Sequence, residues 1–173
     1  MSIVLHGVAA GKGIAIGHAH LITRGTTEVP QYDIDPDKLD AEVARFDNAI
    51  KATRKEQLRS AIPENAPTEL GAFISLHLML LTDVTLSREP IDILREQKIN
   101  AEWALKQQSD KLAAQFDSID DDYLRERKQD MLQVVRRIHN NLVGQSNEIN
   151  LADNLFDDTV LIAHDLSPAD TVL

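Results

Sequence analysis

The residues of this chain that could do chemistry are mainly its six histidines. His18 and His20 alternate along a predicted strand, so both lie on one face, where two imidazoles could hold a metal ion. Neither a carboxylate nor a third histidine lies nearby in sequence to complete such a site. We therefore predict that this chain binds no metal.

A glycine-rich segment near the start of the chain could cradle a phosphate. Gly7, Gly11, Gly13 and Gly17 supply the flexibility, but no predicted helix follows them whose N-terminus could face an anion. The segment 9–13 is therefore predicted to be a turn between strands. The sequence also lacks a Gly-x-Ser-x-Gly elbow and a Walker loop. Without cysteine it has no thiol nucleophile, disulfide or zinc–thiolate site.

The composition indicates a folded, acidic protein. The 173 residues, 43% of them hydrophobic, suffice for one compact domain or two small ones. A formal net charge of −10 disfavours nucleic acid as a partner and fits either a basic protein partner or a solvated acidic surface. No segment is apolar enough to span a bilayer, and residues 1–7 do not resemble a signal peptide. We expect a cytoplasmic protein without membrane insertion.

Strand signals stand at both ends of the chain, with helical signals between them. Apolar patterning predicts strands over Ile3–Val8, Ile14–Ile22 and Thr159–Ala163. Periodicity and capping residues predict helices from Asp35 to about residue 61 and over Thr68–Asp83, Ser87–Gln97, Asn100–Phe116 and Asp121–Val143. The simplest architecture pairs the end strands in one sheet and inserts residues 33–144 as an all-α subdomain, which makes the fold α/β plus an all-α insert.

The predicted helix Thr68–Asp83 has two apolar faces, whereas a surface helix needs only one. The first is typical of a core face and comprises Leu70, Phe73, Ile74, His77, Leu78 and Leu81. The second comprises Ala72, Leu76, Met79 and Leu80. The pattern leaves two alternatives open: the helix is buried all round, or its second face is an exposed patch that binds a partner.

Several segments resemble Enzyme I, the phosphoenolpyruvate–protein phosphotransferase family of the bacterial sugar phosphotransferase system. They follow one another along nearly the whole chain and comprise Gly13–Gly17, Phe73–Asp83, Asp120–Arg127, Arg136–Gly144 and Val160–Asp170. The segment Phe73–Asp83 is similar to the partner-docking helix of that family. Jointly these matches are specific, although each is weak alone.

The resemblance implies an incomplete phosphohistidine α/β domain, residues 1–32 and 145–173, with an inserted helical-bundle subdomain, residues 33–144, that docks the phosphocarrier HPr. Members of the family take a phosphoryl group from phosphoenolpyruvate onto a histidine and pass it to HPr. The acceptor histidine would lie beyond Leu173, as would the domain that binds phosphoenolpyruvate and Mg²⁺. We therefore expect a fragment that is inactive alone and holds no cofactor, taken from a homodimeric enzyme.

The positions that match the family's docking residues form the candidate site. Carried over by position, the implied HPr contacts are Glu69, Ala72, Met79, Leu80, Asp83, Leu86 and Arg127. Val84 and Thr85 stand where the family often has further acids, which indicates a different carrier variant. Ser167 matches a position whose hydroxyl orients the acceptor imidazole, although a hydroxyl before Pro168 could equally be a helix cap.

Other functions stay open on the sequence. One is a stand-alone helical adaptor without any link to phosphoryl chemistry. Another is the nitrogen branch of Enzyme I, which usually carries a sensory domain in front; because Met1 begins directly at the α/β domain, we favour the sugar branch. A swivelling domain from a pyruvate–phosphate dikinase relative is disfavoured by the long helical insert.

Overall fold

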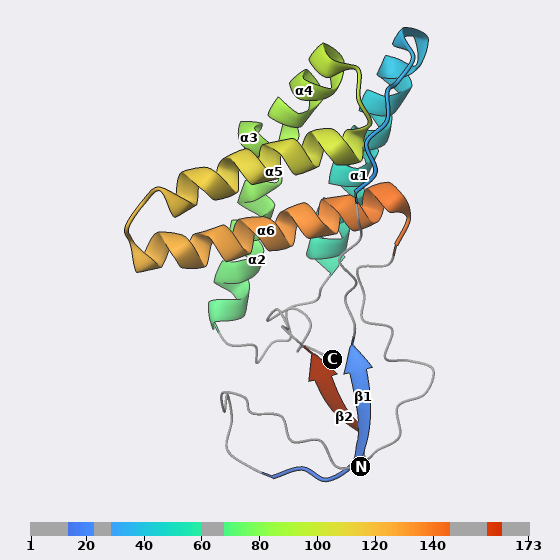
Figure 1. Cartoon of the computed structure of the whole chain (residues 1–173). Helices are drawn as coiled ribbons and strands as arrows, with labels where there is room; N and C mark the ends of the chain where they lie inside the picture. The colour runs from blue at the N-terminus through green and yellow to red at the C-terminus, as the bar shows by residue number, and fades with distance from the viewer. Residues whose placement is uncertain (1–13, 23–28, 60–67, 146–158, 164–173) are drawn as a thin grey trace. The chain divides into compact units, whose positions relative to one another are not determined.

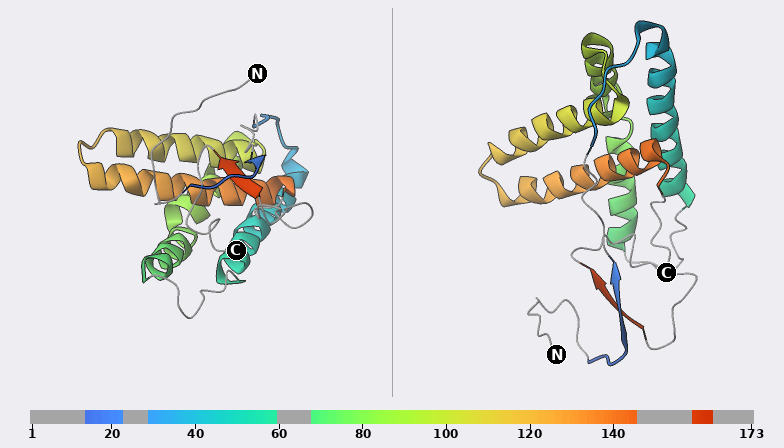
Figure 2. Two further views of the ribbon diagram at one scale, coloured as in Figure 1. Left: turned by 90° about the horizontal axis from the view of Figure 1, so that it is seen from below. Right: turned by 45° about the vertical axis from the view of Figure 1, so that its right-hand side comes forward.

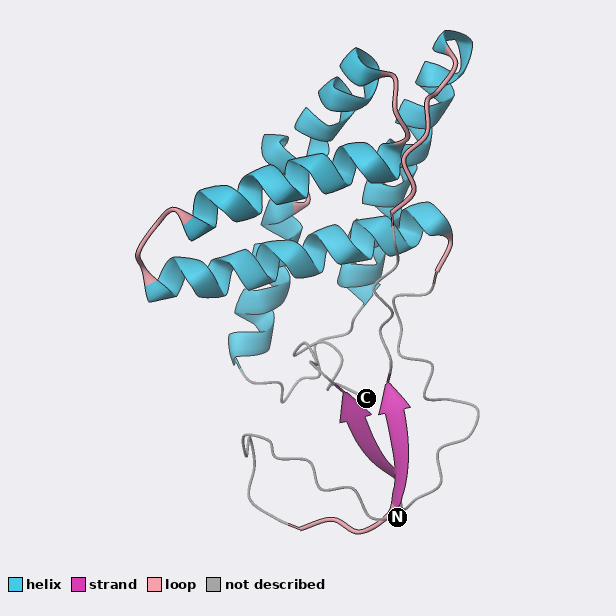
Figure 3. Cartoon of the chain, viewed as in Figure 1, coloured by secondary structure: helices cyan, strands magenta, loops and turns pink. Residues whose placement is uncertain are grey.

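The computed structural model describes residues 14–22, 29–59, 68–145 and 159–163 (Figure 1). The chain divides into two compact units, one formed by residues 1–25 and 150–165 and the other by residues 26–149 and 166–173. In Figure 3 the strands belong to the first unit and the helices to the second. The predicted domain boundaries at residues 33 and 144 stay a prediction, because most of the connecting residues lie outside the described ranges.

The first unit contains a parallel pair of strands, β1 (His18–Ile22) and β2 (Thr159–Ala163). Their register places His18 opposite Thr159 and Ile22 opposite Ala163. The prediction that the two ends of the chain share a sheet is therefore confirmed. The strand predicted from Ile14 begins only at His18, because β2 offers pairing partners for just these residues. The predicted strand Ile3–Val8 lies outside the described residues.

The helical unit is built from two crossing sets of helices. In chain order its elements are the 3-10 helix η1 (Pro36–Lys38), α1 (Leu39–Arg59), α2 (Thr68–Leu80), α3 (Val84–Ser87), α4 (Glu89–Gln97), α5 (Ala101–Asp117) and α6 (Asp122–Val143). In all the views of Figures 1 and 2, α5 and α6 lie side by side and antiparallel. Helix α1 packs against both of them, and α2 packs against α1 and α6.

Helix α2 ends three residues earlier than predicted, at Leu80 rather than Asp83. The reason is local, because Asp83 caps the short helix α3 that follows. Its Oδ1 accepts hydrogen bonds from the backbone N–H of Thr85 at 2.8 Å and from the Thr85 hydroxyl at 2.6 Å. A carboxylate used in this way starts a new helix instead of extending the old one.

The other predicted helix ends are confirmed to within two residues, but two predicted caps act differently. Asp35 and Asn100 stand at N-cap positions, yet neither side chain caps its helix. Asp35 accepts a hydrogen bond from Lys38 Nζ at 2.8 Å instead. Asn100 binds the segment before η1. At the end of α6, Gly144 has a φ of 69°, the left-handed conformation that glycine adopts without strain.

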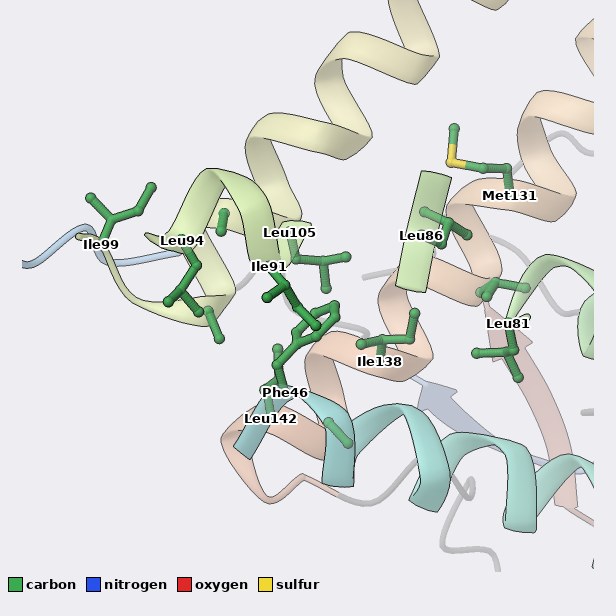
Figure 4. Packing of buried hydrophobic residues seen from close by; sticks show 14 residues of the cluster. Phe46, Leu81, Leu86, Ile91, Leu94, Ile99, Leu105, Met131, Ile138 and Leu142 are labelled. Carbon is green, nitrogen blue, oxygen red and sulfur yellow. The ribbon is translucent and has the colours of Figure 1, made fainter. Parts of the chain in front are cut away.

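The core of the helical unit lies where these helices meet (Figure 4). On α6 an apolar stripe at helical spacing, made of Met131, Ile138 and Leu142, is buried. Other residues of the same core cluster are almost fully buried and include Phe46, Leu81, Leu86, Leu94 and Leu105. Each such side chain contributes about 1.5–3 kcal/mol to folding by its removal from water.

Candidate partner-docking surface

The inner face of α2 packs into the helical unit as the sequence predicted. Ile74, His77 and Leu81 are 6%, 0% and 2% exposed. The ring of Phe73 lies 4.0 Å from that of His77, measured between centroids. This face therefore anchors α2 and fixes which side of the helix is turned outward.

The opposite side of α2 carries an apolar surface. Ala72 is exposed, Met79 is 61% exposed, and Leu76 and Leu80 are half-buried. The spacing of these four residues places them along one side of the helix. We call Ala72, Leu76, Met79 and Leu80 the α2 surface. The alternative in which the helix is buried all round is wrong for Met79, whereas Leu80 also packs partly against the core.

Leu86 does not belong to a surface, although the sequence placed it among the contacts. Its side chain is 0% exposed and lies in the core cluster near Leu81 and Ile138 (Figure 4). Because α3 begins at Val84, the side chain of Leu86 turns inward and that of Val84, 62% exposed, turns to solvent. The prediction of Leu86 as a contact residue is therefore wrong. Leu86 is a core residue that packs beneath the connection between α2 and α3.

The charged residues of the predicted site differ in their exposure and in their bonds to neighbouring side chains. Asp83 is exposed, and its two hydrogen bonds from Thr85 hold the pKa of its carboxyl below the usual value, so it stays ionised. Arg127 is half-buried and forms an ion pair with Asp130, with 3.1 Å between Nη1 and Oδ2. The side chain of Glu69 lies outside the described residues, as does Ser167.

Val84 is the exposed residue that the sequence did not assign to the site. It directly follows Asp83 and stands at the first position of α3. The signal that could have found it is Asp83 itself, because aspartate is a preferred N-cap and a helix that it caps starts at the next residue. A helix starting there places Leu86 inward and leaves Val84 at the edge.

His77 is the described histidine most strongly perturbed by its surroundings. Burial lowers its pKa to about 4, and the positive charge of Arg137 acts in the same direction. Its Nδ1 lies 3.4 Å from the amide nitrogen of Gln57 on α1. A neutral, solvent-inaccessible imidazole of this kind suits a structural role between α1 and α2.

Metal ligands do not gather in the described residues, where no group of three or more histidine or acidic side chains is close enough to hold an ion. Among the helices of the same ranges, none combines the length and the apolarity that crossing a membrane requires.

Comparison with known proteins agrees with this architecture. Residues 6–127 match the family described as PEP-utilising enzyme, N-terminal. Phosphoenolpyruvate-protein phosphotransferase of Cupriavidus necator is 43% identical over 179 aligned positions, which cover 98% of this chain and 30% of the relative. The corresponding protein of Bacillus subtilis is 35% identical, covering 96% of this chain and 29% of the relative. The chain thus spans about 30% of the length of these curated relatives.

Solved structures show the same relationship. A solution NMR structure of Enzyme I superposes with a TM-score of 0.76 at 34% identity, covering 95% of this chain and 66% of that one. The N-terminal domain of a nitrogen-type Enzyme 1 gives 0.67 at 27% identity, covering 92% of this chain and 64% of that one. The resemblance to Enzyme I is therefore confirmed, and the chain belongs to the family of N-terminal domains of PEP-utilising enzymes.

Proposed function

We propose that this chain is the N-terminal part of a phosphoenolpyruvate–protein phosphotransferase and that its α2 surface docks an HPr-type phosphocarrier protein. The observation that carries the proposal is the exposure of Met79, 61%, within an apolar helix face of a folded unit. Apolar patches left in solvent commonly mark interaction sites, and the flexible thioether of methionine adapts to a partner. Membership of this family favours a phosphotransferase over an adaptor unrelated to phosphoryl chemistry.

Apolar residues and charges at the edge of the α2 surface would make different contributions to binding. Well-packed anchors usually supply most of the affinity of an interface, whereas charges at its rim speed the encounter. In this chain Ala72 and Met79 are the exposed anchors, and ionised Asp83 is the edge charge. The net charge of −10 would attract a carrier with a basic face.

The chemistry itself would belong to residues outside this chain. We infer that the acceptor histidine and the sites for phosphoenolpyruvate and Mg²⁺ lie in the rest of the phosphotransferase, which we propose to be a cytoplasmic homodimer. His77, the buried histidine of the helical unit, is a poor acceptor, since its ring is 0% exposed and out of reach of a phosphoryl donor.

We further propose the sugar branch of the phosphotransferase system. The Enzyme I structure shares more sequence with this chain than the nitrogen-type structure does, 34% against 27%. Its TM-score is also higher, 0.76 against 0.67. The apolar Val84, next to Asp83, would favour a carrier that presents an apolar rather than a basic side chain at this edge.

Chemical-shift mapping tests the docking proposal directly. The ¹⁵N-labelled chain would be titrated with an HPr-type carrier from Cupriavidus necator, and separately with a nitrogen-branch carrier as the matched comparison. We expect the largest changes at Ala72, Leu76, Met79 and Val84, with weaker changes for the nitrogen-branch carrier. Changes confined to other helices, or none at all, would refute docking on α2; a stronger response to the nitrogen-branch carrier would refute only the branch.

A further inference from the structure

The segment through which the chain enters the helical unit is held by a short backbone pairing and by one buried side chain. Residues 30–34 lie antiparallel to residues 98–100, with a bridge between Asp33 and Ile99. Asn100, which is 0% exposed, binds this segment three times. Its Oδ1 accepts from Tyr32 N at 3.1 Å, its Nδ2 donates to Pro30 O at 3.0 Å, and its own N–H donates to Tyr32 O at 3.1 Å.

The last turn of α6, at the exit of the helical unit, is held by Arg45 of α1. All five N–H groups of this guanidinium are used. Two donate to Glu42 at 3.0 and 2.6 Å, and two donate to Glu102, both at 2.7 Å. The fifth donates at 3.0 Å to the carbonyl of Leu142, in the last turn of α6.

Glu102 joins the two attachments into one path. Its Oε2 accepts from Arg45 and, at 3.0 Å, from the same Asn100 amide that holds Pro30. Burial acts to raise the pKa of Glu102, but the hydrogen bonds from Arg45 and Asn100 outweigh it and leave the pKa below its usual value. The path therefore runs without a break from Pro30 O through Asn100, Glu102 and Arg45 to Leu142 O, and its carboxylate stays charged.

We propose that Asn100, Glu102 and Arg45 form a clamp that ties the entry and exit segments of the helical unit to each other. A buried ionic cluster adds little stability compared with apolar packing, so its value lies in the geometry that it imposes. A shift of the entry segment would break its hydrogen bonds to Asn100, and a shift of the end of α6 would break the charge-assisted hydrogen bond from Arg45 to Leu142 O in a partly buried site. The three residues therefore couple the entry of the helical unit to its exit, whether or not the proposed function holds.

Amide hydrogen exchange in the intact chain tests the coupling without any carrier. Tyr32 N–H, bound to Asn100, reports on the entry, and Gln145 N–H, bound to Asn140 O at 2.8 Å, reports on the exit. In Glu102→Gln we expect both amides to exchange about tenfold faster, the effect of weakening a hydrogen bond to a charged group. The amide of Val134, in the buried middle of α6, should keep its rate.

Two further variants make the exchange result decisive. Arg45→Lys keeps the charge but loses the fork, so it should accelerate both reporters in the same way. Asp110→Asn removes an exposed ion pair with Lys106 on α5, the helix that also carries Glu102, and should accelerate the exchange of neither reporter amide. Acceleration at one end alone, or an equal effect of Asp110→Asn, would overturn the clamp. If Glu102→Gln also speeds the exchange of the Val134 amide, the whole unit has opened in that variant. The clamp is then judged on Arg45→Lys, which must accelerate Tyr32 and Gln145 and leave Val134 unchanged.

Discussion

Leu86→Ala is expected to destabilise the helical unit far more than Met79→Ala, although the sequence predicted both residues as partner contacts. The structure separates them by exposure, 0% for Leu86 and 61% for Met79. Truncation of a fully buried leucine costs about 2–5 kcal/mol, because the lost burial is followed by a cavity. Leu86 also connects α3 to the core beside Leu81 and Ile138, where little can collapse into the space (Figure 4).

Met79 should be much more tolerant. Only about two fifths of its surface is buried, so a cost near 1 kcal/mol follows from scaling the burial of a full methionine side chain, about 1.5–3 kcal/mol. For a chain of this size about 2–4 °C of Tm corresponds to 1 kcal/mol. Leu86→Ala should therefore lower Tm by about 6–12 °C, for a loss of about 3 kcal/mol, and Met79→Ala by about 2–4 °C.

Fluorescence of the single tryptophan makes the comparison simple. Trp103 lies on α5 and is half-buried in the helical unit, so its emission follows unfolding of that unit in urea or on heating. Leu58→Ala, at an exposed leucine of α1, is the matched control and should behave like Met79→Ala. Equal losses for Leu86→Ala and Met79→Ala would refute the assignment of one residue to the core and the other to the surface.

Three further outcomes are expected. Burial lowers the pKa of His77 to about 4, so the unfolded chain binds more protons between pH 6.5 and 4. This effect leaves the free energy of unfolding unchanged above pH 6.5 and should lower it by about 3 kcal/mol by pH 4. In urea titrations, His77→Gln should largely remove this loss. Asp83→Ala removes the cap of α3 and should cost about 1 kcal/mol, whereas Asp83→Asn should mainly slow association with the carrier, less so at high salt. Amides in α6 should exchange more slowly than those in β1 and β2, because the two strands that pair within the described residues make by themselves a marginal sheet.

Each of these outcomes has a clear opposite. A flat stability profile from pH 7 to pH 4 would show that His77 becomes protonated without penalty. A salt-independent effect of Asp83→Asn on the association rate would assign this carboxylate to the interface centre rather than to its edge. Faster exchange in α6 than in β1 would contradict a helical unit that closes on its own core.

The architecture was predictable because the signals that set it are local or periodic. The stripe on α6 repeats at helical spacing, and its members Met131, Ile138 and Leu142 are buried as expected. The prediction that the chain ends pair rested on two short apolar runs, and β1 and β2 do pair. What sequence could not fix was the start of β1, since a strand begins where its partner begins.

The candidate site was predictable only in part. The two faces of α2 followed from residue spacing, but spacing could not decide whether Met79 or Leu86 was exposed. That depended on the break after Leu80, where Asp83 starts α3 and rotates the following residues. The clamp was not foreseen at all, because Arg45 lies 57 residues from Glu102 in sequence and Asn100 looked like an ordinary helix cap.

The central claim, that the α2 surface docks a phosphocarrier, is tested most directly by Met79→Lys. The variant should melt within a few degrees of the wild type, because its side chain can extend into solvent, and should bind an HPr-type carrier at least about thirtyfold more weakly, the loss of a ~2 kcal/mol anchor. Leu58→Lys places the same charge at an equally exposed residue of α1 and should leave the Kd unchanged. A folded Met79→Lys protein that binds the carrier with wild-type affinity would contradict the account.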